Sequence, residues 1–288
     1  MPEQPAQPSA RDSVPGLTLG QCGDCGATFD LTEIDPRTAQ CAPCFERYLH
    51  QLEAPFLENY AQFGAKARRT VAEALFRSLV LADPDDRKVM GMRIVEEYLG
   101  ASAELIGLYL ALRRRDERPV VESFLTFHLD AGSVADYRHL VDGRDPATLM
   151  RELRLPTLED VEGARRDVPG RQHKQFAAAV RSVPAGLQRV VRVEREALLR
   201  LPDGLKRSNT LVHTLEWMPN RSMNANQVAL LVLDQQRREL GTYALSIDEP
   251  QLEVFIDAID GLTQASRDLI WLSLHVRESA IAGRRWIT

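Results

Sequence analysis

The chain contains four cysteines, which form two Cys-x2-Cys pairs separated by fifteen residues. Each pair places two sulfur atoms on one tight turn, and a connection of this length lets the second pair complete a tetrahedral set of thiolates, as in structural zinc sites. A redox-active dithiol pair and an iron–sulfur cluster are the alternatives, for which a closed loop with this spacing is the less usual setting. The sequence therefore predicts one structural Zn²⁺ bound by Cys22, Cys25, Cys41 and Cys44.

The free cysteines also indicate a compartment. A reducing cytosol keeps such pairs as thiols that can bind metal, whereas a secreted protein would oxidise them, so we expect a cytoplasmic protein. Residues 1–15 lack the basic start and apolar run of a signal peptide, and we expect a disordered tail over 1–19. No run of eighteen uncharged apolar residues occurs, so we expect no membrane span.

The residues around the two pairs resemble a known class of zinc finger. The first pair lies in Cys22-Gly-Asp-Cys25-Gly, and the second opens a segment predicted to be helical, Cys41-Ala-Pro-Cys44-Phe-Glu-Arg. This layout resembles a treble-clef or zinc-ribbon finger and, locally, the short finger of the DksA/TraR group. The resemblance implies a finger over 20–46. The acidic coiled coil of that group is not recognisable in this chain, so binding to RNA polymerase is not implied.

The charge distribution bears on what the finger binds. Residues 1–60 hold nine acidic and three basic side chains, a net charge of −6, and the whole chain carries −5, which leaves +1 for residues 61–288. A zinc ion with four thiolates adds negative charge, whereas phosphate binding depends on Lys and Arg. We therefore expect the finger to contact a protein partner and not a nucleic acid.

A second candidate site lies in the run Lys206-Arg-Ser-Asn-Thr-Leu-Val-His213. It resembles the Arg-x4-6-His signature of HEPN-type helical ribonucleases, although Ser208 departs from the Asn, Asp or His that commonly follows the arginine there. The resemblance implies a composite site in which Arg207 and His213 of two protomers act on the RNA 2′-hydroxyl and phosphate. On a straight helix these positions lie about 240° apart after one full turn, so the hypothesis requires a homodimer or a distorted helix end.

Two further groups of residues suggest metal sites but have simpler explanations. Glu96, Glu97 and Glu104 fall in one predicted helix, but the Glu-x-x-His signature of dimetal carboxylate bundles does not occur, and His213-x-x-Glu216 has the reverse order. A metal-dependent bundle enzyme is therefore a third hypothesis, after paired or solvated carboxylates. A corner near residue 132 also gathers potential ligands, and helix capping explains its aspartates more simply: His128, Asp130, Asp136 and His139.

Common catalytic motifs are absent. The chain contains no Gly-x-Ser-x-Gly, no Gly-x4-Gly-Lys-Ser/Thr, and no cysteine beyond the four assigned to metal. We therefore expect a non-catalytic adaptor, regulator or assembly subunit that acts through protein–protein contacts, with a helical ribonuclease as the alternative.

The elements that must position these residues are predicted to be helical from Arg47 onward, because Leu, Ala, Arg and Glu abound and alternating β-branched runs are few. The clearest helix runs from about Asp86 to Arg115, with a capping start and a basic end. Further helices are expected over 45–63, 66–82 and 120–128. Together they would form a bundle over 47–143.

Prolines organise the remainder of the chain. Asp145-Pro146, Leu155-Pro156 and Val168-Pro169 predict an irregular connection over 144–169, since the residue before a proline avoids the α region. A second helical region over 170–288 follows, with helices near 171–182, 185–200, 207–217, 224–240, 248–260 and 264–281. The predicted fold is mostly α, a four-cysteine finger followed by one or two helical bundles.

Overall fold

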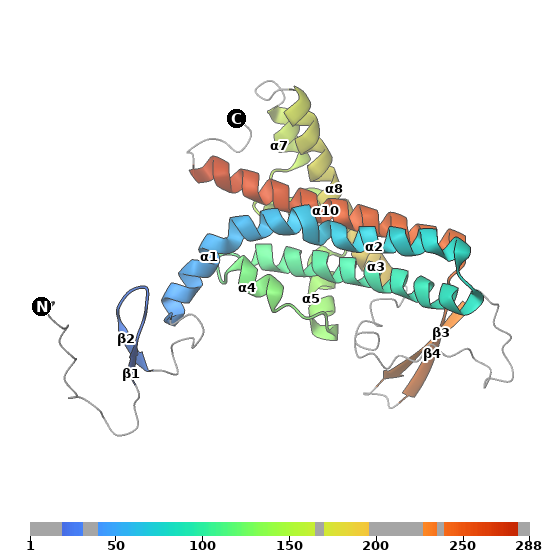
Figure 1. Ribbon diagram of the computed structural model, residues 1–288. Helices are drawn as coiled ribbons and strands as arrows, with labels where there is room; N and C mark the ends of the chain where they lie inside the picture. Colours follow the sequence, from blue (N-terminus) through green and yellow to red (C-terminus); the bar gives the residue numbers. More distant parts are fainter. Residues whose placement is uncertain (1–18, 31–39, 165–169, 196–226, 235–238, 282–288) are drawn as a thin grey trace, which may run out of the picture. The chain divides into compact units, whose positions relative to one another are not determined.

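Figure 1 shows the computed structural model of the chain, which describes residues 19–30, 40–164, 170–195, 227–234 and 239–281. The chain forms two compact units, Met1–Glu53 and Ala54–Thr288. The mostly α-helical fold class is confirmed. The tail predicted over 1–19 and the helix predicted over 207–217 lie outside the described residues, except that Leu19 begins the first strand.

The first unit contains a two-stranded sheet and the start of a helix. Strands β1 (Leu19–Gln21) and β2 (Thr28–Asp30) pair antiparallel. Helix α1 (Ala42–Asn59) begins in this unit and ends in the second. Strand, turn, strand and helix start are the elements that position the four cysteines.

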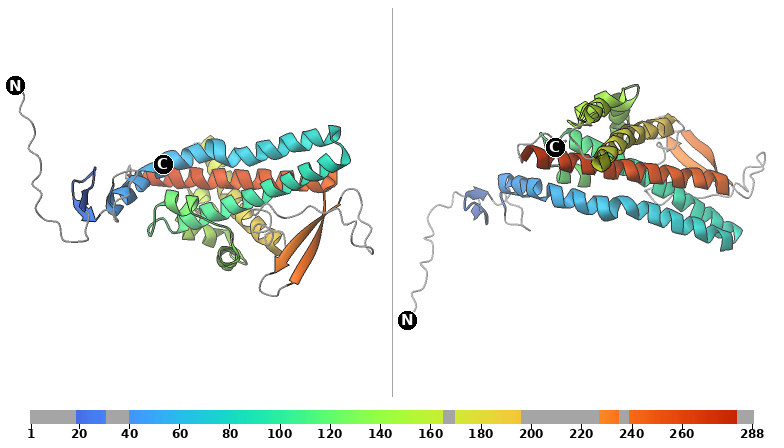
Figure 2. Two further views of the ribbon diagram at one scale, coloured as in Figure 1. Left: turned by 60° about the horizontal axis from the view of Figure 1, so that its bottom comes forward. Right: turned by 90° about the horizontal axis from the view of Figure 1, so that it is seen from above.

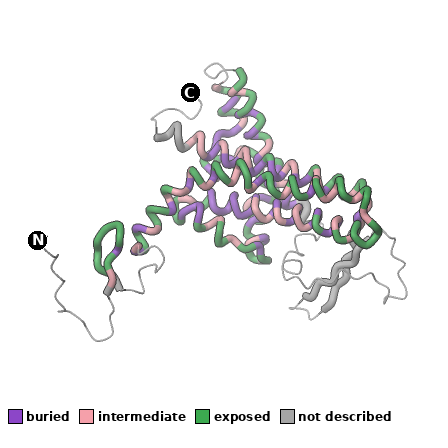
Figure 3. Tube along the Cα trace, in the orientation of Figure 1, coloured by how far each residue is buried: buried purple, intermediate pink, exposed green. Residues whose placement is uncertain are grey.

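Helix α3 (Pro84–Arg113) is the most deeply buried element of the second unit, and it begins two residues before the predicted Asp86. Asp83 caps it, because its carboxylate accepts two N–H groups of the first turn. Every residue from Leu105 to Leu112 is buried, and Figure 3 shows buried residues along much of the helix. A helix that is buried all round must be enclosed by other elements.

Long helices run alongside α3 and shorter ones cover its C-terminal half. Figure 1 and Figure 2 show α2 and α10 beside α3, and α8 packs against α10. The bounds of these elements are α2 Ala65–Ser78, α4 Val120–Leu125, α5 Ala131–Val141, α8 Gly170–Arg195 and α10 Glu249–Ile281. Where two helices were predicted, over 171–182 and 185–200, α8 is one helix that includes Pro184. Likewise α10 spans both 248–260 and 264–281.

Between α1 and α2 the chain keeps its helical course through a π-helical segment, η2 (Tyr60–Gly64). Leu57 and Ala65, on either side of it, are both buried in the second unit. In a regular α-helix, positions eight residues apart differ by about 80° after two full turns. The wider π turn reduces this difference, so both side chains face the same core. A 3₁₀ turn, η3 (Leu79–Leu81), ends α2.

The segment 144–169 differs from the predicted irregular connection. It contains α6 (Pro146–Glu152) and α7 (Leu158–Gly163). Pro146 is the first residue of α6, where its missing N–H is not needed, so this proline starts a helix and does not interrupt one. Leu149 and Val161 are buried in the same cluster as the apolar residues of α3, α8 and α10. The segment therefore belongs to the core of the second unit.

The helix predicted over 224–240 is wrong. Strands β3 (Gln227–Asp234) and β4 (Glu239–Ser246) form an antiparallel pair that runs from Gln227 opposite Ser246 to Asp234 opposite Glu239. The apolar run in β3 is short and contains two valines, Val228 and Val232, which favour strands. A run of this length does not distinguish a buried strand from a helix by periodicity. Among the described helices, none combines the length and apolarity needed to cross a bilayer.

The cap of α6 gives an acid-sensitive contribution to stability. Hydrogen bonds from the hydroxyl and the N–H of Thr148 hold the pKa of Asp145 below its ordinary value. Because the folded-state pKa is lowered, this stabilisation is present above the ordinary pKa of about 3.9 and is lost as the pH falls through the folded value.

We expect Asp145→Asn, which keeps an acceptor but removes the charge, to flatten the loss of stability between about pH 5 and about pH 3 in urea unfolding. The control is Asp136→Asn, which removes an exposed carboxylate from the middle of α5. An unchanged slope in Asp145→Asn would show that the charged cap does not contribute.

Candidate metal centre

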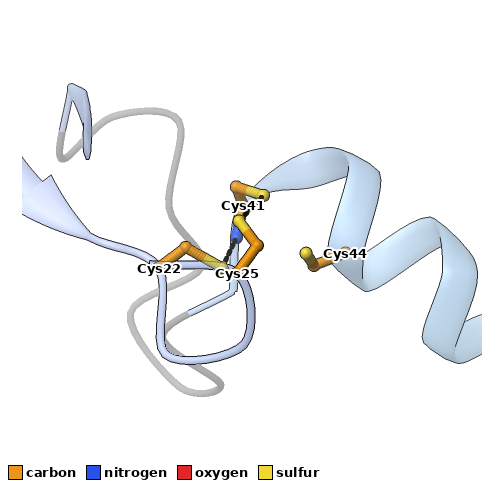
Figure 4. Close-up of side chains that lie close together, drawn as sticks. All are labelled: Cys22, Cys25, Cys41 and Cys44. Carbon is orange, nitrogen blue, oxygen red and sulfur yellow. Dashed lines mark hydrogen bonds between the residues drawn. The ribbon is translucent and has the colours of Figure 1, made fainter. Parts of the chain in front are cut away.

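The first cysteine pair lies in the turn between β1 and β2 (Figure 4). The N–H of Gly26 donates to the carbonyl of Cys22 at 3.0 Å, and the N–H of Cys22 donates to the carbonyl of Ala27 at 2.9 Å. Gly26 has a φ of +70°, a left-handed conformation that disfavours residues with a Cβ. These contacts make a tight knuckle that presents Cys22 and Cys25 to the same side.

The second pair lies at the start of α1. Cys41 directly precedes the helix, and its carbonyl accepts the N–H groups of Cys44 and Phe45 at 3.0 and 2.9 Å. Cys44 therefore falls in the first helical turn, close to Cys41. A knuckle followed by a helix start, each carrying one pair, is the layout predicted from the treble-clef resemblance.

The four sulfur atoms converge. All lie within 4.8 Å of one another, and the Cys25 and Cys41 sulfurs are 3.8 Å apart. A tetrahedral zinc ion with Zn–S distances of about 2.3 Å requires sulfurs about 3.8 Å apart, so the residues fit such an ion. Four closely placed cysteines could therefore hold a metal ion here.

Hydrogen bonds and burial set the electrostatics of the thiols. The N–H of Cys41 donates to the Cys22 sulfur at 3.3 Å, and Arg47 Nη2 donates to the Cys44 sulfur at 3.2 Å. Hydrogen bonds from the backbone N–H groups of Cys25 and Cys41 lower the pKa of Cys22 to about 6. Burial raises the pKa of Cys44 to about 12 and also raises that of Cys41. A metal ion would offset this cost of burying thiolates.

The sequence did not lead us to expect that Arg47 contacts one of the four cysteines, Cys44. It lies three residues after Cys44, one helical turn along α1, so its position was available as a signal. Its guanidinium provides a positive charge beside a thiolate, which partly offsets the negative charge of a four-thiolate centre. An exposed hydrogen bond also joins the knuckle to the residue before Cys41, since Gln40 Nε2 donates to Asp24 Oδ2 at 2.6 Å.

The three glutamates of α3 are paired with arginines and do not form a metal site. Arg68 of α2 donates to Glu104 at 2.6 Å and to Glu97 at 3.0 Å, and the Tyr60 hydroxyl donates to Glu104 at 2.6 Å. Burial and the Glu104 charge raise the pKa of Tyr60 well above its ordinary value. Glu96 pairs with Arg93. The interpretation of these glutamates as members of ion pairs is therefore correct.

The corner near residue 132 does not form a metal site. Asp130 caps α5 by accepting the N–H of Ser133, which lowers its pKa, while the other members of that corner are exposed: His128, Asp136 and His139. Within the described ranges, the cysteine set is the only group of three or more potential ligands that lie together. Arg207, His213 and Glu216 lie outside the residues that the structure describes.

Comparison of the chain with protein-family models, curated proteins and solved structures gave no match.

The Arg68 network leads to a prediction about stability. Its three charged side chains are only 13% to 31% exposed, and a Cβ at Gly100 would lie 2.2 Å from Arg68 Nη1, so the guanidinium lies directly over the α3 backbone. Removing the cation leaves two partly buried carboxylates unpaired. We expect Arg68→Ala to reduce the free energy of unfolding by about 2 kcal/mol, below the value for fully buried pairs because solvent screens this one.

The neighbouring Arg69 is the matched control. It pairs with Glu73 and Asp260, but its side chain is 47% exposed, so we expect Arg69→Ala to cost less than about 1 kcal/mol. Chemical denaturation followed by circular dichroism measures both variants. Equal losses for the two substitutions would contradict the importance of the Arg68 network.

Proposed function

We propose that the four cysteines bind one structural Zn²⁺ and that the protein is a non-catalytic adaptor, regulator or assembly subunit acting through protein–protein contacts. The observation that supports this most directly is the closed set of four converging sulfurs. Catalytic zinc sites keep a coordination position open for water or substrate, whereas four cysteine ligands fill a tetrahedral shell.

The exposed residues near the four cysteines also suit contact with a protein. Near the proposed metal site Asp24 and Glu46 are exposed, and Tyr48, two residues after Glu46, is 42% exposed. Exposed carboxylates next to an aromatic side chain suit a partner with a basic, partly apolar surface. Because Glu97 and Glu104 are paired with Arg68, they do not supply free acid–base groups for catalysis.

The zinc proposal predicts one zinc ion per chain in protein purified under reducing conditions. Cys41→Ser removes one of four ligands, and we expect it to lose the metal and the fold of the finger. We expect most of the helical circular dichroism to remain, because the second unit has its own core. Ala42→Ser, an exposed neighbour, is the control and should keep its zinc. Elemental analysis that finds no metal, or finds iron with visible absorbance, would contradict the proposal.

The adaptor proposal predicts a stoichiometric protein partner whose association depends on the acidic residues of the finger. After affinity purification from the native cell and identification by mass spectrometry, we expect binding to weaken with salt, and Asp24→Lys with Glu46→Lys to slow association more than they speed dissociation. Asp136→Lys, on exposed α5 surface, is the control.

Two results would count against the adaptor. Binding that does not change with salt would indicate an apolar interface, and the acidic residues would then not guide association. RNA cleavage that is lost in both Arg207→Ala and His213→Ala, with folding intact, would establish the ribonuclease alternative in its place.

A further inference from the structure

We propose that Cys25 and Cys41 are a site of oxidative modification by hydroperoxides, at which formation of a Cys25–Cys41 disulfide expels the zinc ion. The inference rests on the proposed zinc site and adds to it a reactive position and a regulatory consequence. It follows from differences among the four sulfur ligands in exposure, hydrogen bonding and distance.

Exposure distinguishes Cys25 from the other three ligands. Cys22, Cys41 and Cys44 are between 1% and 4% exposed, whereas Cys25, in the turn of the knuckle, is an exposed residue. Oxidation of cysteine follows thiolate character and access, and metal binding makes all four sulfurs thiolates. Access therefore selects Cys25 as the first sulfur that a hydroperoxide reaches.

Hydrogen bonding separates the ligands in a second way. The sulfur of Cys22 accepts the N–H of Cys41, and that of Cys44 accepts Arg47 Nη2. Donors that stabilise a thiolate lower its nucleophilicity. Neither bond goes to Cys25 or Cys41, so these two sulfurs are left more nucleophilic than those of Cys22 and Cys44, and Cys25 is the exposed one of the two.

The position of Cys41 makes it the partner for the second step. Its sulfur lies 3.8 Å from that of Cys25, and Figure 4 shows the two side chains next to each other although they come from the knuckle and the helix start. A disulfide between them would therefore join the two halves of the metal site. Cys22 and Cys44 would be left as an incomplete set of ligands.

The chemistry requires a hydroperoxide as oxidant. The Cys25 thiolate attacks one peroxide oxygen, an S–O bond forms, the O–O bond breaks, and hydroxide leaves after the sulfur has given up two electrons. The Cys41 thiolate then attacks the Cys25 sulfur, an S–S bond forms, and the S–O bond breaks with loss of a second hydroxide. Two protons convert the hydroxides to water. Zinc retains two of its four thiolates and dissociates.

The test treats the zinc-loaded full chain with hydrogen peroxide and measures zinc release with a chromogenic chelator and disulfides by mass spectrometry. After free thiols are blocked, cleavage before Asp24 separates Cys22 from Cys25, and fragmentation between Cys41 and Cys44 assigns the other end. We expect zinc release to accompany a Cys25–Cys41 disulfide.

Two substitutions give a matched comparison, because histidine replaces cysteine as a zinc ligand in Cys₃His sites. Cys25→His removes the reactive sulfur, and we expect zinc release at least about tenfold slower. Cys44→His also replaces one ligand but keeps Cys25 and Cys41, and we expect peroxide to release its zinc faster than from Cys25→His, with the Cys25–Cys41 disulfide.

Release from Cys25→His at the wild-type rate, or a disulfide that pairs Cys25 with Cys22, would overturn the inference. Elemental analysis before peroxide treatment separates this failure from failure of the zinc proposal. A chain without zinc at the outset contradicts the metal site itself, whereas a loaded chain that reacts elsewhere contradicts only the assignment of Cys25 and Cys41.

Discussion

The burial of α3 is the constraint on which the second unit depends. Eight consecutive residues, Leu105 to Leu112, are removed from solvent, so no face of this part of the helix is left to water. One or two neighbouring helices cannot enclose a helix on all sides, and apolar residues of α8, α10 and the short helices before them complete the cover. Because α3 must be enclosed on all sides, residues on both sides of the segment 144–169 share a single core.

Enclosing α3 also determines how its charged residues are accommodated. Glu97 and Glu104 lie on the part of the helix that faces α2, and a carboxylate that loses water requires a cation or hydrogen-bond donors. Arg68 meets both carboxylates and Tyr60 adds a second donor to Glu104. Residues that resemble a metal-binding cluster in the sequence thus serve to join α2 to α3.

The sequence predicted the four-cysteine cluster and α3 because both depend on local patterns. Cysteine spacing identifies the site, and an aspartate cap with a long apolar repeat identifies the helix. The roles of Pro146 and of the run around Val228 depend on tertiary context: a proline can end one helix or start the next, and a short apolar run fits a strand or a helix equally well. Arg68 is separated from Glu104 by 36 residues, so no local pattern could reveal their contact.

The π-helical segment η2 sets a limit on changes in chain length. A residue removed from Tyr60–Gly64 would restore the regular α-helical repeat with Leu57 and Ala65 seven positions apart, about 20° from each other around the helix. Both side chains would still face the core, whereas an added residue would rotate Leu57, now 1% exposed, by about 100° away from it. Along this stretch, lengthening the chain by a single residue would therefore be more damaging than shortening it by one.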